Sequence, residues 1–317
     1  MTPETASHSM DTPEVHSFET IHQRTLGLVQ ARKRPRVALV SPTSAETADA
    51  FGRAIQDGLL DPIVVGRETD IAQHFTEHQS LLNGAVVGVS DATEAVARAI
   101  AMIDAGEVDA IVQGGIRPTP FLAALFDHAH QFRLPGRTIS HVAVLNPASY
   151  PKLLFLTDSA VMVAPDLKGK MNLLANLATV AEKVGVKNPR VAVLGAVEAV
   201  YPQMQATLDG AVLAKMAERH QVKGLRVDGP LSFDVAVDMA AARSKGVTTS
   251  EVAGQADGLL APNIEVANGI YNAMSLYGNA GVGGVLVGGR VPVAMHSRAD
   301  NADARYNSIV LAVLMAG

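Results

Sequence analysis

The sequence predicts an α/β fold with largely parallel β-sheets. Short apolar runs, typical of buried strands, alternate along the chain with longer segments whose apolar residues recur every three or four positions, as they do in amphipathic helices. Strands that alternate with helices build right-handed βαβ units, and these assemble into parallel sheets. Hydrophobic residues make up 48% of the 317-residue chain, which is enough for a sizeable core in one large domain or two smaller ones.

The first half of the chain alternates regularly between the two kinds of segment. Residues 1–17 are rich in Thr, Ser, Pro and Glu and are expected to form a flexible tail. Beyond the tail, Ser44 and Asp91 precede periodic segments and are expected to cap helices. Strands are expected at 36–40, 62–65, 85–89 and 110–113, and helices at 18–31, 45–57, 70–77, 92–105 and 121–132.

The second half continues the alternation after a boundary near Ile139, where Pro135-Gly136 interrupts the pattern. Asp166 precedes an amphipathic segment that runs to about Val184. Strands are expected at 142–145, 153–156, 191–194, 225–227, 256–260, 282–287 and 291–295, and further helices at 203–219, 235–245, 264–277 and from 301 onward.

Composition excludes several classes of function. The net charge is −5 and no basic block stands out, so we expect no nucleic-acid partner. The chain contains no cysteine, which excludes disulfides, thiolate metal sites and cysteine nucleophiles and fits a reducing compartment. No apolar run approaches the roughly 18 residues that cross a bilayer, and the N-terminus is polar. We therefore expect a cytoplasmic protein with no membrane partner.

The turn from His296 to Asp300 lies where the last expected strand gives way to the last helix. Ligands of open parallel sheets bind at the carboxyl ends of strands, so Ser297, Arg298 and Asp300 are well placed to bind an anion. A second interpretation is also open, in which Ser297 or Asp300 is the N-cap of the last helix and Arg298 is solvated.

Three other groups of residues suggest ligands but also have simpler explanations. Gly114 and Gly115 follow a strand and either let backbone N–H groups approach a phosphate or simply permit a tight turn. Asp158 and Asp166 would bind a divalent metal only with a further carboxylate, so a strand-end turn and a helix N-terminal acid are favoured. His128 and His130 lack a third ligand at suitable spacing and are expected on an exposed helix face. No metal site is predicted.

Several of these turns together resemble the phosphate acetyltransferase and phosphate butyryltransferase family. The resemblance is in order, covers about residues 18–317, and looks more like the butyryl branch than the acetyl branch. The motifs that carry it are Ser140-His-Val-Ala-Val144, Leu153-Leu-Phe-Leu-Thr-Asp158 with Pro165-Asp166, Val227-Asp-Gly-Pro-Leu231 with Asp234, and Ser297-Arg-Ala-Asp300 with Asn307-Ser308.

The resemblance implies two α/β domains with an interdomain cleft, like those of the isocitrate and isopropylmalate dehydrogenases. With the boundary near Ile139, the first domain would comprise residues 18–138 together with 288–317, and the second residues 139–287. It also implies a homodimer and the reaction acyl-CoA + phosphate ⇌ acyl phosphate + CoA. The partners would be coenzyme A, acyl-CoA, inorganic phosphate and acyl phosphate, with CoA as a substrate and no permanently bound cofactor.

The family's serine–arginine pair falls on Ser297 and Arg298, and its catalytic acid follows a few residues later. The acetyl branch would place that acid at Ala304, and the butyryl branch at Asp303, with Asp300 as a rival. We favour Asp303 as the base that takes the proton of the CoA thiol, and Asp300 as the residue that holds the turn. The serine hydroxyl would stabilise the oxyanion of the acyl carbonyl.

The family's glycine turn is followed by Ser-Thr, of which Thr119 matches and the serine is replaced by Pro118. A family arginine falls on Ala124, so Arg117 or Arg133 is expected to supply that positive charge. Asp158, Asp166 and Asp228 belong to the matched motifs and are expected to be structural or to border the cleft. The residues expected to bind phosphate or CoA are Arg298, Gly114, Gly115, Arg117, Thr119 and Arg133.

Two alternatives to an active acyltransferase remain. One is a metal-dependent NAD(P) dehydrogenase of the same fold, which would need Asp158 and Asp166 as ligands. The other is a degenerate acyl-CoA-binding protein, for which the replacements Pro118 and Ala124 are the evidence.

Overall fold

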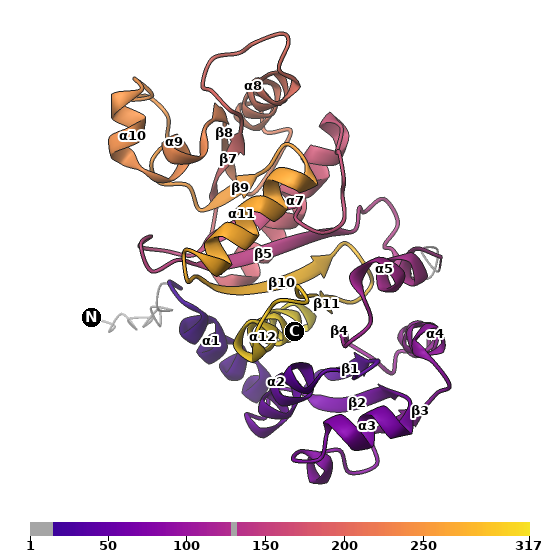
Figure 1. Cartoon of the computed structure of the whole chain (residues 1–317). Helices are drawn as coiled ribbons and strands as arrows, with labels where there is room; N and C mark the ends of the chain where they lie inside the picture. Colours follow the sequence, from indigo (N-terminus) through magenta and orange to yellow (C-terminus); the bar gives the residue numbers. More distant parts are fainter. Residues whose placement is uncertain (1–14, 128–131) are drawn as a thin grey trace, which may run out of the picture.

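A computed structural model shows an α/β protein built on one sheet of eleven strands; it describes residues 15–127 and 132–317 (Figure 1). His128, His130 and most of the expected N-terminal tail lie outside the described residues. The strand order is β3-β2-β1-β4-β11-β10-β5-β6-β9-β7-β8. The strands are β1 Arg36–Val40, β2 Asp61–Gly66, β3 Val86–Gly88, β4 Ala110–Gln113, β5 Ser140–Asn146, β6 Leu154–Thr157, β7 Arg190–Leu194, β8 Arg226–Leu231, β9 Gly258–Leu260, β10 Gly281–Val287 and β11 Val293–Ala294.

Helices follow most strands, as the alternation predicts. The expected helix at 235–245 is instead two short helices, because Asp238 has an extended backbone and its carboxylate accepts a hydrogen bond from the N–H of Ala240, which starts a new helix. The helices are α1 Phe18–Ala31, α2 Ala45–Gln56, α3 Glu68–His74, the 3₁₀ turn η1 Gln79–Leu81, α4 Ala92–Asp104, α5 Pro118–Asp127, α7 Leu167–Val184, α8 Gln205–Glu218, α9 Phe233–Val237, α10 Met239–Ser244, α11 Ile264–Leu276 and α12 Ala302–Ala316.

Helices cover both faces of the sheet, which is why the strands read as continuous apolar runs rather than alternating ones. In β5, Val142 and Val144 belong to the core cluster that includes residues of α7 and α12. Ala143 and Leu145, which point the opposite way, pack in the cluster that includes residues of α11. Figure 1 shows α11 crossing in front of β5 and α12 lying beside α1 and α2.

The sheet consists of two largely parallel halves joined by antiparallel pairing in its centre. β10 pairs antiparallel with β5 on one side and with β11 on the other, and β5 pairs antiparallel with β6. The expected boundaries at 138/139 and 287/288 fall beside the start of β5 and the end of β10, but the sheet is continuous across them. The division into two domains therefore stays a prediction. No helix in the described part of the chain is long and apolar enough to cross a bilayer.

Candidate active site

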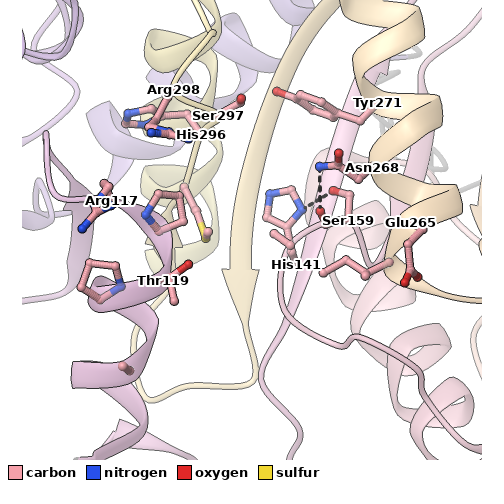
Figure 2. A pocket seen from close by; sticks show the side chains of 16 residues that line it. Arg117, Thr119, His141, Ser159, Glu265, Asn268, Tyr271, His296, Ser297 and Arg298 are labelled. Atoms are coloured by element: carbon pink, nitrogen blue, oxygen red, sulfur yellow. Dashed lines mark hydrogen bonds between the residues drawn. The ribbon is translucent and has the colours of Figure 1, made fainter.

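A cavity of about 840 Å³ lies where β4, β6 and β11 end. One wall carries Arg117 and Thr119 from the start of α5 and residues 296–298 from the turn after β11. The facing wall carries His141, Ser159 and residues of α11 (Figure 2). The structure thus brings together Ser297 and Arg298 with Arg117 and Thr119, residues that are far apart in the sequence.

The turn that carries Ser297 is separate from the helix that follows it. α12 begins at Ala302, and its N-cap is Asn301, whose side chain accepts a hydrogen bond from the N–H of Ala304 at 2.9 Å. The interpretation of Ser297 or Asp300 as the helix cap is therefore wrong, because the helix starts later than either residue requires. Arg298 is exposed and its side chain lines the cavity.

Asp300 holds this turn in place from a buried position. Its Oδ2 accepts hydrogen bonds from the backbone N–H of Ser297 at 2.7 Å and from the hydroxyl of Tyr271 at 2.8 Å. Burial raises the pKa of the Asp300 carboxyl above its usual value, although both hydrogen bonds act in the opposite direction. Tyr271 comes from α11, so this contact connects the turn to the facing wall.

Arg305 also supports this turn, through hydrogen bonds to its backbone. This buried arginine of α12 donates to the carbonyl oxygen of Asp300 at 3.0 Å and to that of Arg298 at 3.4 Å. It also donates to Oγ1 of Thr47 at 2.6 Å and to Nε2 of His296 at 2.5 Å. Burial, followed by the charge of Arg305, lowers the pKa of the His296 imidazole to about 3.

The lowered pKa of His296 predicts a loss of stability in mild acid. An unfolded histidine binds a proton below about pH 6.5, whereas the buried His296 stays neutral until about pH 3, so protons favour the unfolded chain in this range. Between pH 7 and pH 5 we expect His296 to lower the free energy of unfolding by about 2 kcal/mol. Urea unfolding of the wild type and His296→Asn at both values measures this, and the same pH dependence in both proteins would contradict it.

The facing wall is organised by His141. Its Nδ1 lies 3.0 Å from Oγ of Ser159, and the carbonyl of Met295 forms a hydrogen bond with the same imidazole. The ring reaches Met295 by crossing β10 at Gly284, where a Cβ atom would lie 2.3 Å from Nε2 of His141. Gly284 is thus required by a close approach, and Ser159 is the hydroxyl that can donate to Nδ1. Burial lowers the pKa of His141.

Three of the residues expected from the sequence do not reach the cavity. The Asp303 carboxylate is 75% exposed and forms an ion pair with Arg53 at 2.7 Å. Arg133 is exposed, and its backbone forms an isolated bridge with Gly289. Asp228 lies in β8 at the edge of the sheet, where its carboxylate accepts a hydrogen bond from the N–H of Gly229. None of the three is among the residues that line the cavity.

Gly114 and Gly115 do not offer their backbone N–H groups to a ligand. These N–H groups donate to the carbonyl oxygens of Val40 at 2.9 Å and Ser41 at 2.7 Å. A Cβ atom at Gly114 would lie 2.2 Å from the Ser41 oxygen, and one at Gly115 would lie 1.7 Å from Oγ1 of Thr43. The expected role of these glycines in phosphate binding is corrected: they let two neighbouring strand-end turns approach closely.

Asp158 and Asp166 have the structural roles that the sequence favours. The buried Asp158 carboxylate accepts hydrogen bonds from the backbone N–H groups of His141, Ala160 and Val161. Asp166 is the N-cap of α7 and accepts from the N–H of Gly169 at 2.7 Å. Among the described residues, no group of three or more His, Asp or Glu side chains is placed to bind a metal.

Comparison with known proteins identifies the family. Residues 90–313 match the family model described as phosphate acetyl/butaryl transferase. A phosphate butyryltransferase of Clostridium acetobutylicum is 37% identical over 290 residues, which are 91% of this chain and 96% of the relative. The chain belongs to the phosphate acetyl/butyryl transferase family. Its members are acyltransferase enzymes, so the sequence resemblance is confirmed.

Other members of the phosphate acetyl/butyryl transferase family agree in sequence and fold. A phosphate acetyltransferase of Thermotoga maritima is 32% identical and covers 90% of this chain and 96% of its own length. The crystal structure of a branched-chain phosphotransacylase from Enterococcus faecalis superposes with a TM-score of 0.77 at 26% identity, covering 89% of this chain and 99% of the other. The expected α/β fold is therefore confirmed.

Several residues in or beside the cavity were missed by the sequence analysis, although four of them stand next to or within the matched motifs. His141 is the second residue of the Ser140 motif, Ser159 follows Asp158, and His296 precedes Ser297. Arg305 follows the Ser-Arg turn and precedes Asn307, whereas Tyr271 of α11 lies in no matched motif. The sequence signal that was available is a histidine or hydroxyl residue beside a matched motif. Whether such a side chain points into the cavity depends on the fold.

Proposed function

We propose that this chain transfers a short acyl group, acetyl to butyryl, between coenzyme A and inorganic phosphate in the cavity described above. The observation that carries the proposal is the meeting of Ser297, Arg298, Arg117 and Thr119 on one wall in a chain of this family. In the direction of acyl phosphate synthesis, a phosphate oxygen attacks the acyl carbon, the new C–O bond forms, the C–S bond breaks, and CoA leaves as the thiolate.

The phosphate end of the site consists of guanidinium and hydroxyl groups. Arg298 and Arg117 both line the cavity, and a planar guanidinium donates two hydrogen bonds to a phosphate while keeping its charge. Ser297 is half-buried and its N–H is held by Asp300, so its hydroxyl has a defined place beside Arg298. A hydroxyl there can stabilise the oxyanion as the acyl carbon becomes tetrahedral.

In the reverse direction the sulfur of CoA attacks the acyl carbon, the C–S bond forms and the C–O bond to phosphate breaks. The proton of the CoA thiol then requires an acceptor that reaches the cavity, and Asp303 does not. Two groups on the facing wall do: the carboxylate of Glu265, and Nδ1 of His141 through the hydroxyl of Ser159. We therefore no longer assign the base to Asp303. Direct transfer between the two bound substrates stays the proposed scheme, because the chain has no cysteine to form a thioester intermediate.

The test of the proposed function is phosphate-dependent release of thiol from acetyl-, propionyl- and butyryl-CoA. We expect release with at least one of these substrates only when phosphate is present, and acyl phosphate should form in equal amount. Thiol release at background level with all three would overturn the proposal.

No permanently bound cofactor is proposed, so treatment with EDTA is expected to leave the rate unchanged.

Two further measurements separate the alternatives. NADH formation with a hydroxy acid would indicate the dehydrogenase, which the family match supports less well than the acyltransferase. Stabilisation by CoA without any turnover would indicate the degenerate acyl-CoA-binding protein.

We also propose that the chain forms a homodimer in the cytoplasm. Large exposed apolar side chains support an interface, among them Leu276 and Tyr277 at the end of α11, which are 73% and 87% exposed. The absence of cysteine fits a reducing compartment. Light scattering coupled to gel filtration measures the mass and hence the number of subunits.

A further inference from the structure

His296 is a buried histidine whose protonated nitrogen is fixed by its neighbour. Nε2 lies 2.5 Å from Nη1 of Arg305, and a guanidinium donates hydrogen bonds but cannot accept them. Nε2 must therefore accept with its lone pair, and the proton of the neutral ring lies on Nδ1. Among the described residues, Nδ1 of His296 has no hydrogen-bond partner.

A buried N–H group without an acceptor is costly. Leaving such a group unsatisfied costs about 1–3 kcal/mol, so native proteins usually provide a partner or reserve the group for a ligand. His296 is only 7% exposed but lines the cavity next to Ser297 and Arg298. Figure 2 shows these three residues together on one wall. Nδ1 itself is closed to solvent in the structure, but the ring borders the cavity, so the cavity is the side from which we infer that an acceptor approaches.

We propose that Nδ1–H of His296 donates a hydrogen bond to an oxygen of the phosphate that Arg298 binds. The inference rests on the proposed function and adds a phosphate-binding residue to it. Arg305 has two roles in this arrangement: it selects the Nδ1–H tautomer, and its charge adds to the larger effect of burial in keeping the ring neutral. The Nδ1–H group of the neutral ring keeps its proton throughout the physiological pH range, so it can donate to the phosphate whatever the protonation state of the phosphate.

A simpler explanation must be distinguished from this one. His296 could serve only as an acceptor that holds Arg305, which in turn supports the turn through the carbonyl oxygens of Asp300 and Arg298. Two substitutions separate the roles. The side-chain amide of asparagine lies near the position of Nδ1 and retains a donor there, whereas the amide oxygen of glutamine can reach the position of Nε2 and retains the acceptor for Arg305.

The experiment compares His296→Asn with His296→Gln, using inorganic phosphate as the probe. Calorimetry measures phosphate binding without turnover, and steady-state assays with saturating butyryl-CoA give kcat and the KM for phosphate. We expect the Gln variant to bind phosphate about tenfold more weakly than the Asn variant, the usual size of one lost hydrogen bond. His74→Gln, a half-buried histidine outside the cavity, is the control.

Each other outcome has a defined meaning. Weaker phosphate binding in the Asn variant than in the Gln variant would show that the acceptor role matters and would overturn the proposal. Equal affinity in both, or a fall in kcat with unchanged phosphate affinity, would also overturn it. If the wild type binds phosphate but releases no thiol from any acyl-CoA, the proposed function fails, while the binding comparison still decides the role of His296.

Discussion

Arg298→Lys is expected to raise the KM for phosphate about tenfold or more, with little change in the melting temperature. Lysine keeps the positive charge but replaces a planar fork of donors by a single flexible ammonium group, so it loses bidentate recognition of the phosphate. The side chain of Arg298 is exposed and makes no ion pair with the described residues, so its replacement should not disturb the core. Steady-state kinetics with phosphate varied at saturating acyl-CoA measures the effect.

Arg133→Lys is the matched control for this prediction. The sequence offered Arg133 as another phosphate ligand, but the structure places it at a bridge to Gly289, outside the residues that line the cavity. We expect its KM for phosphate to stay within about twofold of wild type, as for an ordinary surface substitution. If the KM for phosphate changes as little in Arg298→Lys as in Arg133→Lys, Arg298 contributes only general positive charge.

The fold could be predicted from the sequence because its signals are local and repeated. Short apolar runs flanked by turn residues located nearly every strand, and Ser44, Asp91 and Asp166 are the N-caps that the sequence indicated. The joining of the two halves could not be predicted in the same way. β10 pairs antiparallel with β5, which lies far earlier in the sequence, and no local pattern specifies that register.

The site was predicted less completely because side-chain direction depends on helix phase and tertiary contacts. Ser297, Arg298, Arg117 and Thr119 lie at the cavity wall, and all four stand at strand ends or helix starts, but their expected roles stay predictions. Asp303 was expected at the site because the resemblance to the butyryl branch places the family's acid there. In the structure Asp303 lies in the first turn of α12, and its carboxylate pairs with Arg53 of α2.

His141 illustrates a residue that sequence reasoning cannot place. Its imidazole contributes to the cavity only because Gly284 of the neighbouring strand lets the ring cross to Met295. Each residue is ordinary in its own segment, and the glycine reads simply as a break in an apolar run. The functional arrangement arises from the pairing of strands that the sequence does not specify.

Asp300→Ala is expected to reduce turnover about a hundredfold and to lower stability by about 2 kcal/mol. The substitution removes the acceptor of two hydrogen bonds, from the N–H of Ser297 and the hydroxyl of Tyr271, and leaves both donors in a buried place. The turn that presents Ser297 and Arg298 then loses its fixed geometry. Turnover in the thiol-release assay and the midpoint of urea unfolding measure the two effects.

Asp300→Asn and Asp303→Asn decide whether Asp300 acts by position or by proton transfer. An amide oxygen at the place of Oδ2 still accepts from Ser297 and Tyr271, so a positioning residue should retain at least tenfold more activity as Asn than as Ala. Asp303→Asn should be nearly as active as wild type, because this carboxylate is exposed and bound to Arg53. If Asp300→Asn were as inactive as Asp300→Ala, Asp300 would be the base. A hundredfold loss in Asp303→Asn at unchanged stability would return that role to Asp303 and require the start of α12 to move toward the cavity during catalysis.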